Sequence, residues 1–374
     1  MDTTPITGLE ELDAHLDELV QDQTVPLNAK LFDEVELQLT GSNMPPLVVR
    51  FLPRLTAILE QYTEDPTILA SLAVKLLGPV TFTQVLSLTS EESLVQALDS
   101  PAPAANILAM TVIHKAAASP ADAAILSAMP QLVAAFIRRW LAAPQVEVGQ
   151  KGGKVLGDLL DIDCELPIPP PPPSNTSGTE IALRKSPGQG KLWRRLFADK
   201  QLYTLLLALC AGRHPDTSRD QHQLSLAQGR VLRVLPRLAA LNFQAVSRSN
   251  IAAPTAVRFT NGHGGGQESV AGPRPGEGLL QFAALRMVDR SDVLLHLSVV
   301  DFFEVFLGLM RVTEYSTYKV DTIRGILAEA ISEDAVLKEA LLSLPERTIE
   351  EEAEDLKRWL QEVMPGETVR VAVR

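Results

Sequence analysis

Apolar residues recur along this chain at the spacing of an α-helix. Near the start, Leu9, Leu12, Leu16 and Leu19 follow one another at intervals of three and four residues and form a stripe along one helix face. Short breaks rich in proline, glycine or serine separate such segments, and these residues start or stop helices. The pattern therefore predicts a chain built of many helices packed on one another.

The periodic segments give the expected helices. In the first part of the chain they lie near residues 6–22, 27–40, 45–62, 66–77, 91–99, 103–118, 120–141 (broken at Pro130) and 147–162. In the second part they lie near residues 190–198, 200–211, 222–248, 279–288, 292–311, 316–330, 332–343 and 348–362.

One of these segments returns later in the chain. Residues 48–57 read VVRFLPRLTA and residues 231–240 read VLRVLPRLAA, and a weaker copy begins at Met129. With the proline-rich segment set aside, the prolines of these copies stand roughly 80 residues apart, which is room for two helical hairpins of about 40 residues. This periodicity predicts an all-α solenoid of the HEAT or armadillo type, whose stacked repeats usually hold another macromolecule.

Two irregular stretches interrupt the helices. Residues 166–189 contain five consecutive prolines, which cannot continue a helix, so we expect an extended linker there. It divides the chain into an N-terminal solenoid half, 1–165, and a C-terminal half, 190–374. A glycine- and proline-rich loop is expected at 252–278.

Composition agrees with a helical scaffold and narrows its partners. Aromatic residues make up only 5% of the chain, and the net charge is -12, which opposes binding to nucleic-acid phosphates. The apolar run at 293–310 carries His296, Asp301 and Glu304, so a buried helix explains it better than a membrane span. The acidic start has no signal-peptide pattern, and the two cysteines form no CxxC motif. We therefore expect a cytoplasmic protein, also found in the nucleus, without direct nucleic-acid or membrane binding.

Catalytic motifs are incomplete. The glycines and lysines at 149–155 resemble a phosphate-binding loop, but Val155 stands where a serine or threonine would hold magnesium. His263 begins an HGGG segment like that of esterases, but the chain has no GxSxG nucleophile motif. The six histidines are scattered without metal-ligand spacing. We expect no enzyme activity, no cofactor and no metal.

A basic ridge is the most unusual feature of this acidic chain. Arg230, Arg233 and Arg237 fall on one edge of a predicted helix, where they would either bind carboxylates of a partner or pair within the chain. Pairing with acidic residues of the next repeat, such as Asp289, Asp292 or Asp301, is the simpler interpretation. The full set of candidate partner-binding residues is Trp193, Arg194, Arg195, Arg230, Arg233, Arg237, Tyr318 and Asp321.

Five segments, at 154–165, 188–210, 224–241, 279–304 and 343–360, together resemble the fungal "high spontaneous mutagenesis" family, which is named for mismatch repair. Members of that family act as assembly chaperones for the base of the proteasome regulatory particle. The resemblance implies a HEAT-type solenoid that binds the C-terminal domain of one AAA ATPase subunit and is itself a monomer. Two alternatives remain: a generic armadillo or HEAT adaptor, and a factor acting directly in DNA mismatch repair.

Overall fold

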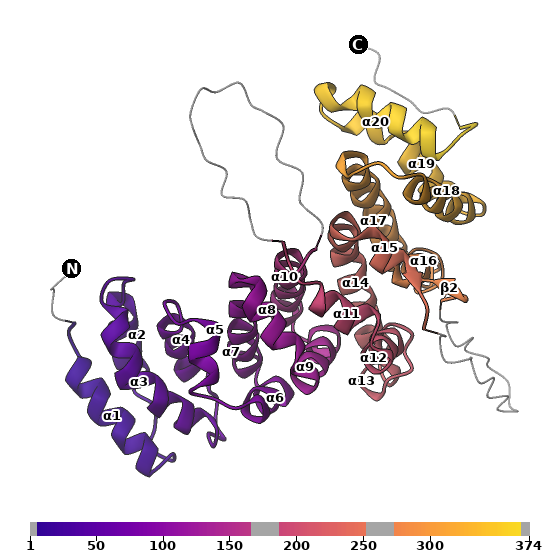
Figure 1. Cartoon of the computed structure of the whole chain (residues 1–374). Coiled ribbons are helices and arrows are strands. Elements are labelled where there is room, and N and C mark those ends of the chain that lie inside the picture. The colour runs from indigo at the N-terminus through magenta and orange to yellow at the C-terminus, as the bar shows by residue number, and fades with distance from the viewer. Residues whose placement is uncertain (1–5, 166–186, 252–272, 368–374) are drawn as a thin grey trace, which may run out of the picture. The chain divides into compact units, whose positions relative to one another are not determined.

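The computed structural model describes residues 6–165, 187–251 and 273–367. The chain divides into two compact units. Unit 1 comprises Met1–Arg139 and Gln145–Ile162, and unit 2 comprises Trp140–Pro144 and Asp163–Arg374. The described residues are almost entirely helical, which confirms the predicted all-α solenoid class (Figure 1). The assignment to HEAT or armadillo repeats remains a prediction.

Unit 1 is a succession of short helices in which each helix packs on others close to it in sequence. The helices are α1 (Leu9–Gln21), α2 (Ala29–Gln38), α3 (Met44–Leu59), α4 (Thr67–Leu76), α5 (Phe82–Leu86), α6 (Glu91–Asp99), α7 (Pro103–His114), the 3-10 helix η1 (Lys115–Ala118), α8 (Pro120–Ser127), α9 (Pro130–Ala142), whose last residues belong to unit 2, and α10 (Val146–Ile162).

Polar caps explain where several of these helices begin. Asn28, Ser90 and Ser119 each accept a hydrogen bond from the backbone two or three positions into the following helix. Thr81 forms a full capping box with Gln84 at the start of α5. The apolar stripe predicted on α1 is the buried face of that helix, with Leu12, Leu16 and Leu19 fully enclosed.

Unit 2 contains the remaining elements: α11 (Lys191–Phe197), α12 (Lys200–Cys210), α13 (Pro215–Ser218), α14 (Gln221–Leu241), α15 (Phe243–Ser247), β1 (Arg248–Ser249), β2 (Gly276–Glu277), α16 (Leu279–Leu285), α17 (Val293–Val312), α18 (Thr317–Ile331), α19 (Ala335–Leu342), the 3-10 helix η2 (Leu344–Arg347) and α20 (Glu350–Val363). The long helices α14 and α17 lie side by side, and α16 and α18 form a second row beside them (Figure 1). Phe302, Phe303 and Phe306 of α17 fill the core of this unit.

The three repeat-like prolines do not occupy equivalent positions. Pro53 lies inside α3 and Pro236 inside α14, as the strong copies of the repeat predict. Pro130 instead is the first residue of α9, which follows α8 at an angle of 94°. A proline at that position needs no backbone hydrogen bond, so it starts a helix without bending one. The weaker copy at Met129 is therefore not a structural equivalent of the other two.

Hydrogen bonds join the two ends of each irregular stretch. The Gly188 amide donates to the Cys164 carbonyl at 2.8 Å, and the Gly190 amide donates to the Asp163 carbonyl at 2.9 Å. The predicted linker at 166–189 therefore leaves unit 2 and returns beside its starting point. The stretch that begins at residue 252 is closed in the same way, because β1 pairs antiparallel with β2. Most of both predicted segments lies outside the described residues.

The other differences from the predicted helices are short elements. The pattern did not predict α5 or α13. It predicted a single helix at 222–248, where the structure has α14, α15 and the first residue of β1. Asn242 explains the break, because its extended backbone ends α14 and its side chain caps α15. Elements of four or five residues are too short to show a hydrophobic period, so they leave little trace in the sequence.

Candidate partner-binding surface

The predicted basic ridge is present on α14, but its three arginines have different surroundings. Arg230 is half-buried, and its Nη1 donates to the carbonyls of Trp140 and Leu141 at 3.0 and 2.9 Å. It thereby binds the carboxyl end of α9, where helix carbonyls lack partners within the helix. Burial and, to a lesser degree, the neighbouring positive charge of Arg233 together lower the pKa of Arg230 to about 10.

Arg233 is the exposed member of the ridge. It forms no hydrogen bond or ion pair within the described part of the chain. Two of the acidic residues expected to pair with the ridge are engaged in their own turns, since Asp289 accepts from Ser291 and Asp292 caps the start of α17. The predicted ladder between repeats is therefore wrong for Arg233, whose guanidinium is available to a partner.

The three candidate residues of α11 contribute to the structure of unit 2. Trp193 is buried and its ring stacks on Phe197 at a centroid distance of 5.5 Å. Arg194 pairs with Glu165 at 2.7 Å and Arg195 pairs with Asp199 at 2.8 Å. The backbone amides of Leu192 and Trp193 donate to the buried carboxylate of Asp163, which holds the start of this helix in place.

The two candidate residues of α18 also lie apart from the ridge. The Tyr318 hydroxyl lies 2.9 Å from Ser247 Oγ, and the Arg248 guanidinium lies 4.3 Å from the centre of the Tyr318 ring. Asp321 is exposed and pairs with Arg324, one turn away on the same helix, at 3.3 Å. The structure thus places the predicted residues in three separate groups, on α11, α14 and α18.

A surface that the sequence analysis missed lies on α17. Leu294, Leu297, Val305 and Val312 fall on one face of this helix, and Leu294 is 77% exposed and Leu297 56% exposed. Asp301 is the one charged residue on that face. The opposite face carries the phenylalanines of the core. The signal was visible in the sequence, because a helix that is apolar on all sides cannot bury every side against a single neighbour.

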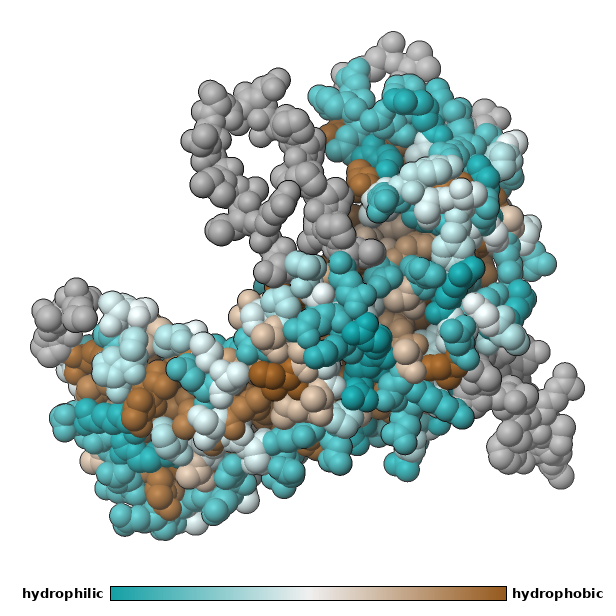
Figure 2. Space-filling model, viewed as in Figure 1, coloured by the Kyte–Doolittle hydropathy of each residue, from teal (hydrophilic) through white to brown (hydrophobic). Residues whose placement is uncertain are grey.

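Helix α17 is also, among the described residues, the one helix long and apolar enough to cross a membrane by length and composition alone. Many core helices of soluble proteins pass the same test. Hydrophobic side chains reach the surface of both units, mixed with hydrophilic ones (Figure 2). An uncovered apolar helix face of this kind is typical of a surface that contacts another protein.

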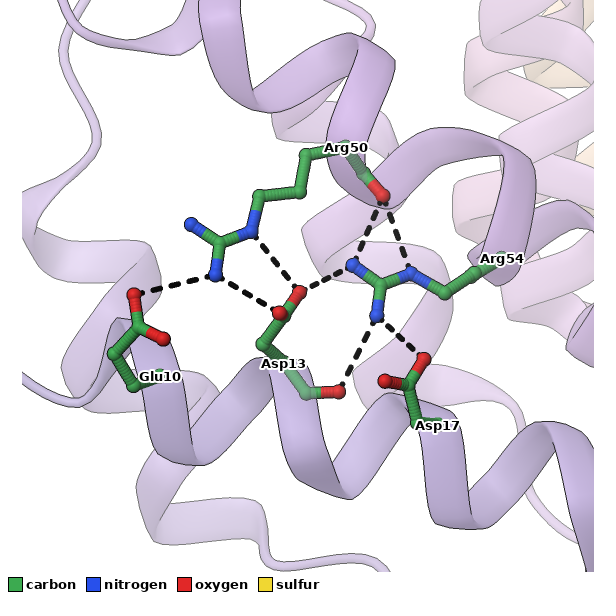
Figure 3. A network of polar contacts seen from close by, with 5 residues as sticks. All are labelled: Glu10, Asp13, Asp17, Arg50 and Arg54. Atoms are coloured by element: carbon green, nitrogen blue, oxygen red, sulfur yellow. Dashed lines mark hydrogen bonds and ion pairs between the residues drawn. The ribbon is translucent and has the colours of Figure 1, made fainter.

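Unit 1 shows how the same arginine spacing binds carboxylates. Arg50 and Arg54, at the positions of α3 that correspond to Arg233 and Arg237 in the repeat, face the acidic edge of α1 (Figure 3). Arg50 donates to both oxygens of Asp13 at 3.0 and 2.9 Å, and Arg54 donates to Asp17 at 2.7 Å and also to Asp13. The hydrogen bond from Arg50 is the main reason that the pKa of Asp13 is lowered to about 2.

Two hollows offer other places for a ligand. A cavity of about 250 Å³ lies among α3, α4, α5, α6 and α7 and is lined mostly by aliphatic side chains. Its one charged lining residue, Glu60, accepts a hydrogen bond from Ser93 Oγ at 2.8 Å. Such a lining suits an apolar side chain or a small apolar molecule.

The second hollow lies in unit 2 and has a volume of about 580 Å³. His296 Nε2 lies 2.8 Å from Asp334 Oδ2, and Ser332 lines the same hollow. This is the residue set of a catalytic triad, but the Ser332 hydroxyl donates to the Glu329 carbonyl, and Asp334 caps α19 through the Leu337 amide. Burial raises the pKa of Asp334, but the bonds from Leu337 and His296 outweigh it and leave the pKa lowered. The arrangement fixes the start of α19.

A family model described as "DNA mismatch repair protein HSM3, N terminal domain" matches residues 9–135. This match supports the resemblance of the chain to the HSM3 family. The matched residues lie wholly within unit 1, from α1 into α9. The segments of unit 2 that resemble the same family, including the ridge on α14, lie beyond the match. No curated protein matches the chain. The similarity to this family therefore rests on unit 1, and the candidate surface rests on the geometry of unit 2.

Proposed function

We propose that this protein is a non-enzymatic assembly chaperone for the base of the proteasome regulatory particle. It binds the C-terminal domain of one AAA ATPase subunit through the helical surface of unit 2. The observation that carries the proposal is the uncovered apolar face of α17, on the helix that packs along α14 with its exposed Arg233. Exposed apolar side chains and exposed arginines are the usual make-up of a protein-binding surface.

The surface would act by covering part of the ATPase subunit until the neighbouring subunits of the ring are bound. Leu294 and Leu297 would enter apolar depressions of the partner, and this burial would supply most of the affinity. Arg233 would set the orientation by pairing with a carboxylate. Many modest contacts spread over several helices give a complex that can dissociate. The chaperone can therefore dissociate from the ATPase subunit once the ring is complete.

Affinity purification of the tagged protein from its own cells tests this proposal. We expect the wild-type protein to recover base ATPase subunits without the mature core particle. The double variant Leu294→Asp with Leu297→Asp should recover at least about tenfold less, because buried anchors carry most of the binding energy. Leu37→Asp is the matched control, since Leu37 is 82% exposed on α2 of unit 1. Equal recovery by both variants would place the contact elsewhere.

A direct role in DNA mismatch repair is the second candidate, and the description of the matching family favours it. In that case mismatch-repair proteins would replace ATPase subunits in the purification. The net charge of -12 opposes direct contact with DNA phosphates, so such a role would also pass through a protein partner. In either case we propose a monomer that works in the cytoplasm and also in the nucleus.

A further inference from the structure

The cavity in unit 1 is enclosed by core residues. It has a volume of about 250 Å³ and lies among α3, α4, α5, α6 and α7. Those of its lining residues that are buried are all apolar: Leu52, Ala73, Leu77, Val85, Leu94, Ala109 and Val112. Water binds poorly in a space with such walls, because it finds few hydrogen-bond partners there. An apolar group that enters the cavity would therefore replace weakly held water and gain close contacts.

Polar residues surround the opening of this cavity. The polar lining residues are all exposed or half-buried: Thr56, Glu60, Tyr62, Thr89, Ser93, Gln96 and Ser100. Glu60 accepts from Ser93 Oγ at 2.8 Å, so this bond joins the end of α3 to α6. The side chains of Tyr62, Thr89 and Gln96 form no hydrogen bond within the described part of the chain. They are therefore available to the backbone of a bound peptide.

The sequence around the cavity is strongly acidic. Between residues 55 and 114 the chain contains one lysine, no arginine and the acidic residues Glu60, Glu64, Asp65, Glu91, Glu92 and Asp99. Asp99 pairs with Arg138, and Glu91 accepts from the Leu132 amide, so these two carboxylates are engaged. The lysine, Lys75, donates to a backbone carbonyl of α2. No lysine or arginine lines the cavity, so the negative charge at its opening is not neutralised there.

Three carboxylates lie at or near the opening. Glu60 is a lining residue and is exposed. Burial and the negative charges of Glu64 and Asp65 raise the pKa of Tyr62, another lining residue, which places both carboxylates close to it. A positive charge next to the apolar part of a ligand would therefore be attracted to this opening.

We propose that this cavity binds one large apolar side chain of a partner protein's peptide segment, with a lysine or arginine beside it at the acidic opening. The volume favours a single anchoring side chain, because sites for small molecules and cofactors usually enclose about 300–1,000 Å³. Anchors of this kind carry much of the binding energy of a protein contact. The site lies in unit 1 and does not depend on the function proposed for the surface of unit 2.

Disulfide capture on the full-length protein measures such weak binding directly. Thr89→Cys places a thiol at the opening, and both natural cysteines are buried. Short peptides with an N-terminal cysteine and glycine linker end in Leu-Arg, Leu-Glu or Ser-Arg, and compete with a reducing thiol. Mass spectrometry of the intact protein gives the captured fraction. We expect Leu-Arg to withstand about tenfold more reducing thiol than Ser-Arg and about threefold more than Leu-Glu.

Substitutions in the Thr89→Cys background separate the two parts of the site. Ala97→Phe fills the cavity from α6 and should remove the preference for leucine over serine, and Ala97→Leu does the same with a smaller side chain if the first variant does not fold. Glu60→Gln keeps an acceptor for Ser93 but loses the charge. It should reduce the preference for arginine over glutamate and keep the preference for leucine. Glu11→Cys on the exposed side of α1 is the control, and it should capture all three peptides equally.

Three results would overturn the proposal. The first is equal capture of all peptides at Thr89→Cys. The second is a preference for Leu-Arg that persists when the cavity is filled, because the contact would then lie outside it. The third is capture of isopentanethiol, which carries the apolar group alone, as strongly as the Leu-Arg peptide, because the site would then bind a small apolar molecule.

Discussion

At the scale of single residues, buried or half-buried cations that bind backbone carbonyls are a recurring means of fixing helix ends in this protein. Lys319 Nζ donates to the carbonyls of Met310, Thr313 and Glu314 and to Thr313 Oγ1, at 2.6 to 3.1 Å. Arg230 does the same at the end of α9. Burial lowers the pKa of Lys319, but the four acceptors and the carboxyl end of α17 favour its charged form.

Replacing Lys319 with methionine should destabilise the protein by about 2 kcal/mol, because the buried oxygens at the end of α17 would lose their donor. Lys338→Met is the matched control. Lys338 is partly exposed in an ion pair with Glu367, so its loss should cost at most about 1 kcal/mol. Urea unfolding followed by circular dichroism measures both. Equal losses would show that the carbonyls at the end of α17 do not depend on Lys319.

Asp13 should make stability depend on pH in the acidic range. Its pKa is lowered from 3.8 to about 2 in the folded protein, so its contribution is fully present above pH 3.8 and is lost as the pH falls through about 2. Asp13→Asn should therefore cost about 1 kcal/mol at pH 7, after allowance for solvent screening of this partly exposed pair. Unfolding at pH 7, 4 and 3 checks the sign. A difference that grows as the pH falls would contradict it.

The sequence indicated the residue types at these sites but not all of their partners. The spacing of Arg230, Arg233 and Arg237 correctly placed them on one helix edge. That Arg230 binds the end of α9 was not predictable, because its acceptors are 89 and 90 residues away in the sequence. Trp193 was predicted to bind a partner, but tertiary packing buries it against Phe197.

At the scale of helices and connections, hydrogen bonds join the two ends of each irregular stretch. The amides of Gly188 and Gly190 bond back to Cys164 and Asp163, and β1 bonds to β2. Gly188 lies so close to the backbone of Asp163 that a Cβ atom on Gly188 would approach the Asp163 carbonyl carbon to 2.1 Å. The helices of unit 2 on the two sides of each stretch are therefore held together by bonds between the ends of that stretch.

Replacing residues 167–186 with a few glycines should leave the thermal midpoint within about 2 °C of the wild type, because the ends are already joined. Gly188→Val should lower it by clearly more, because the added side chain displaces the Asp163 backbone. Differential scanning calorimetry compares the two variants. A large decrease in the thermal midpoint of the shortened variant would mean that residues 167–186 contribute to the packing of unit 2.

Long helices with an apolar stripe were predictable, whereas the short helices α5 and α13 were missed although a side chain caps the start of each. The predicted segments near 91–99 and 147–162 match α6 and α10 almost residue for residue. The break predicted at Pro130 is present between α8 and α9. The equivalence of Pro130 with Pro53 and Pro236 was wrong, because a proline at the first position of a helix and one inside a helix look alike in a short repeat match. The sequence of α17 indicated that some apolar side of this helix stays uncovered, but it did not show which side, and that depends on how α14 and the other helices pack against it.

At the scale of the whole molecule, the similarity to the HSM3 family and the candidate function rest on different units. The family match ends at residue 135 in unit 1, whereas Arg233 and the exposed face of α17 lie in unit 2. The repeat connects the two, because the arginine spacing that binds α1 in unit 1 returns on α14. The account therefore predicts that unit 1 satisfies its arginines internally and that unit 2 presents Arg233 to a partner.

The most direct test of this account measures binding of the purified full-length protein to the purified C-terminal domain of each base ATPase subunit. Isothermal titration calorimetry gives the dissociation constant of each pair. The account predicts that one domain binds with a dissociation constant of about 1 μM or tighter. Binding of that domain should weaken about tenfold for Arg233→Glu and remain unchanged for Arg219→Glu, which makes the same charge change at another exposed arginine of unit 2. Failure of every ATPase domain to bind the wild-type protein would contradict the central claim.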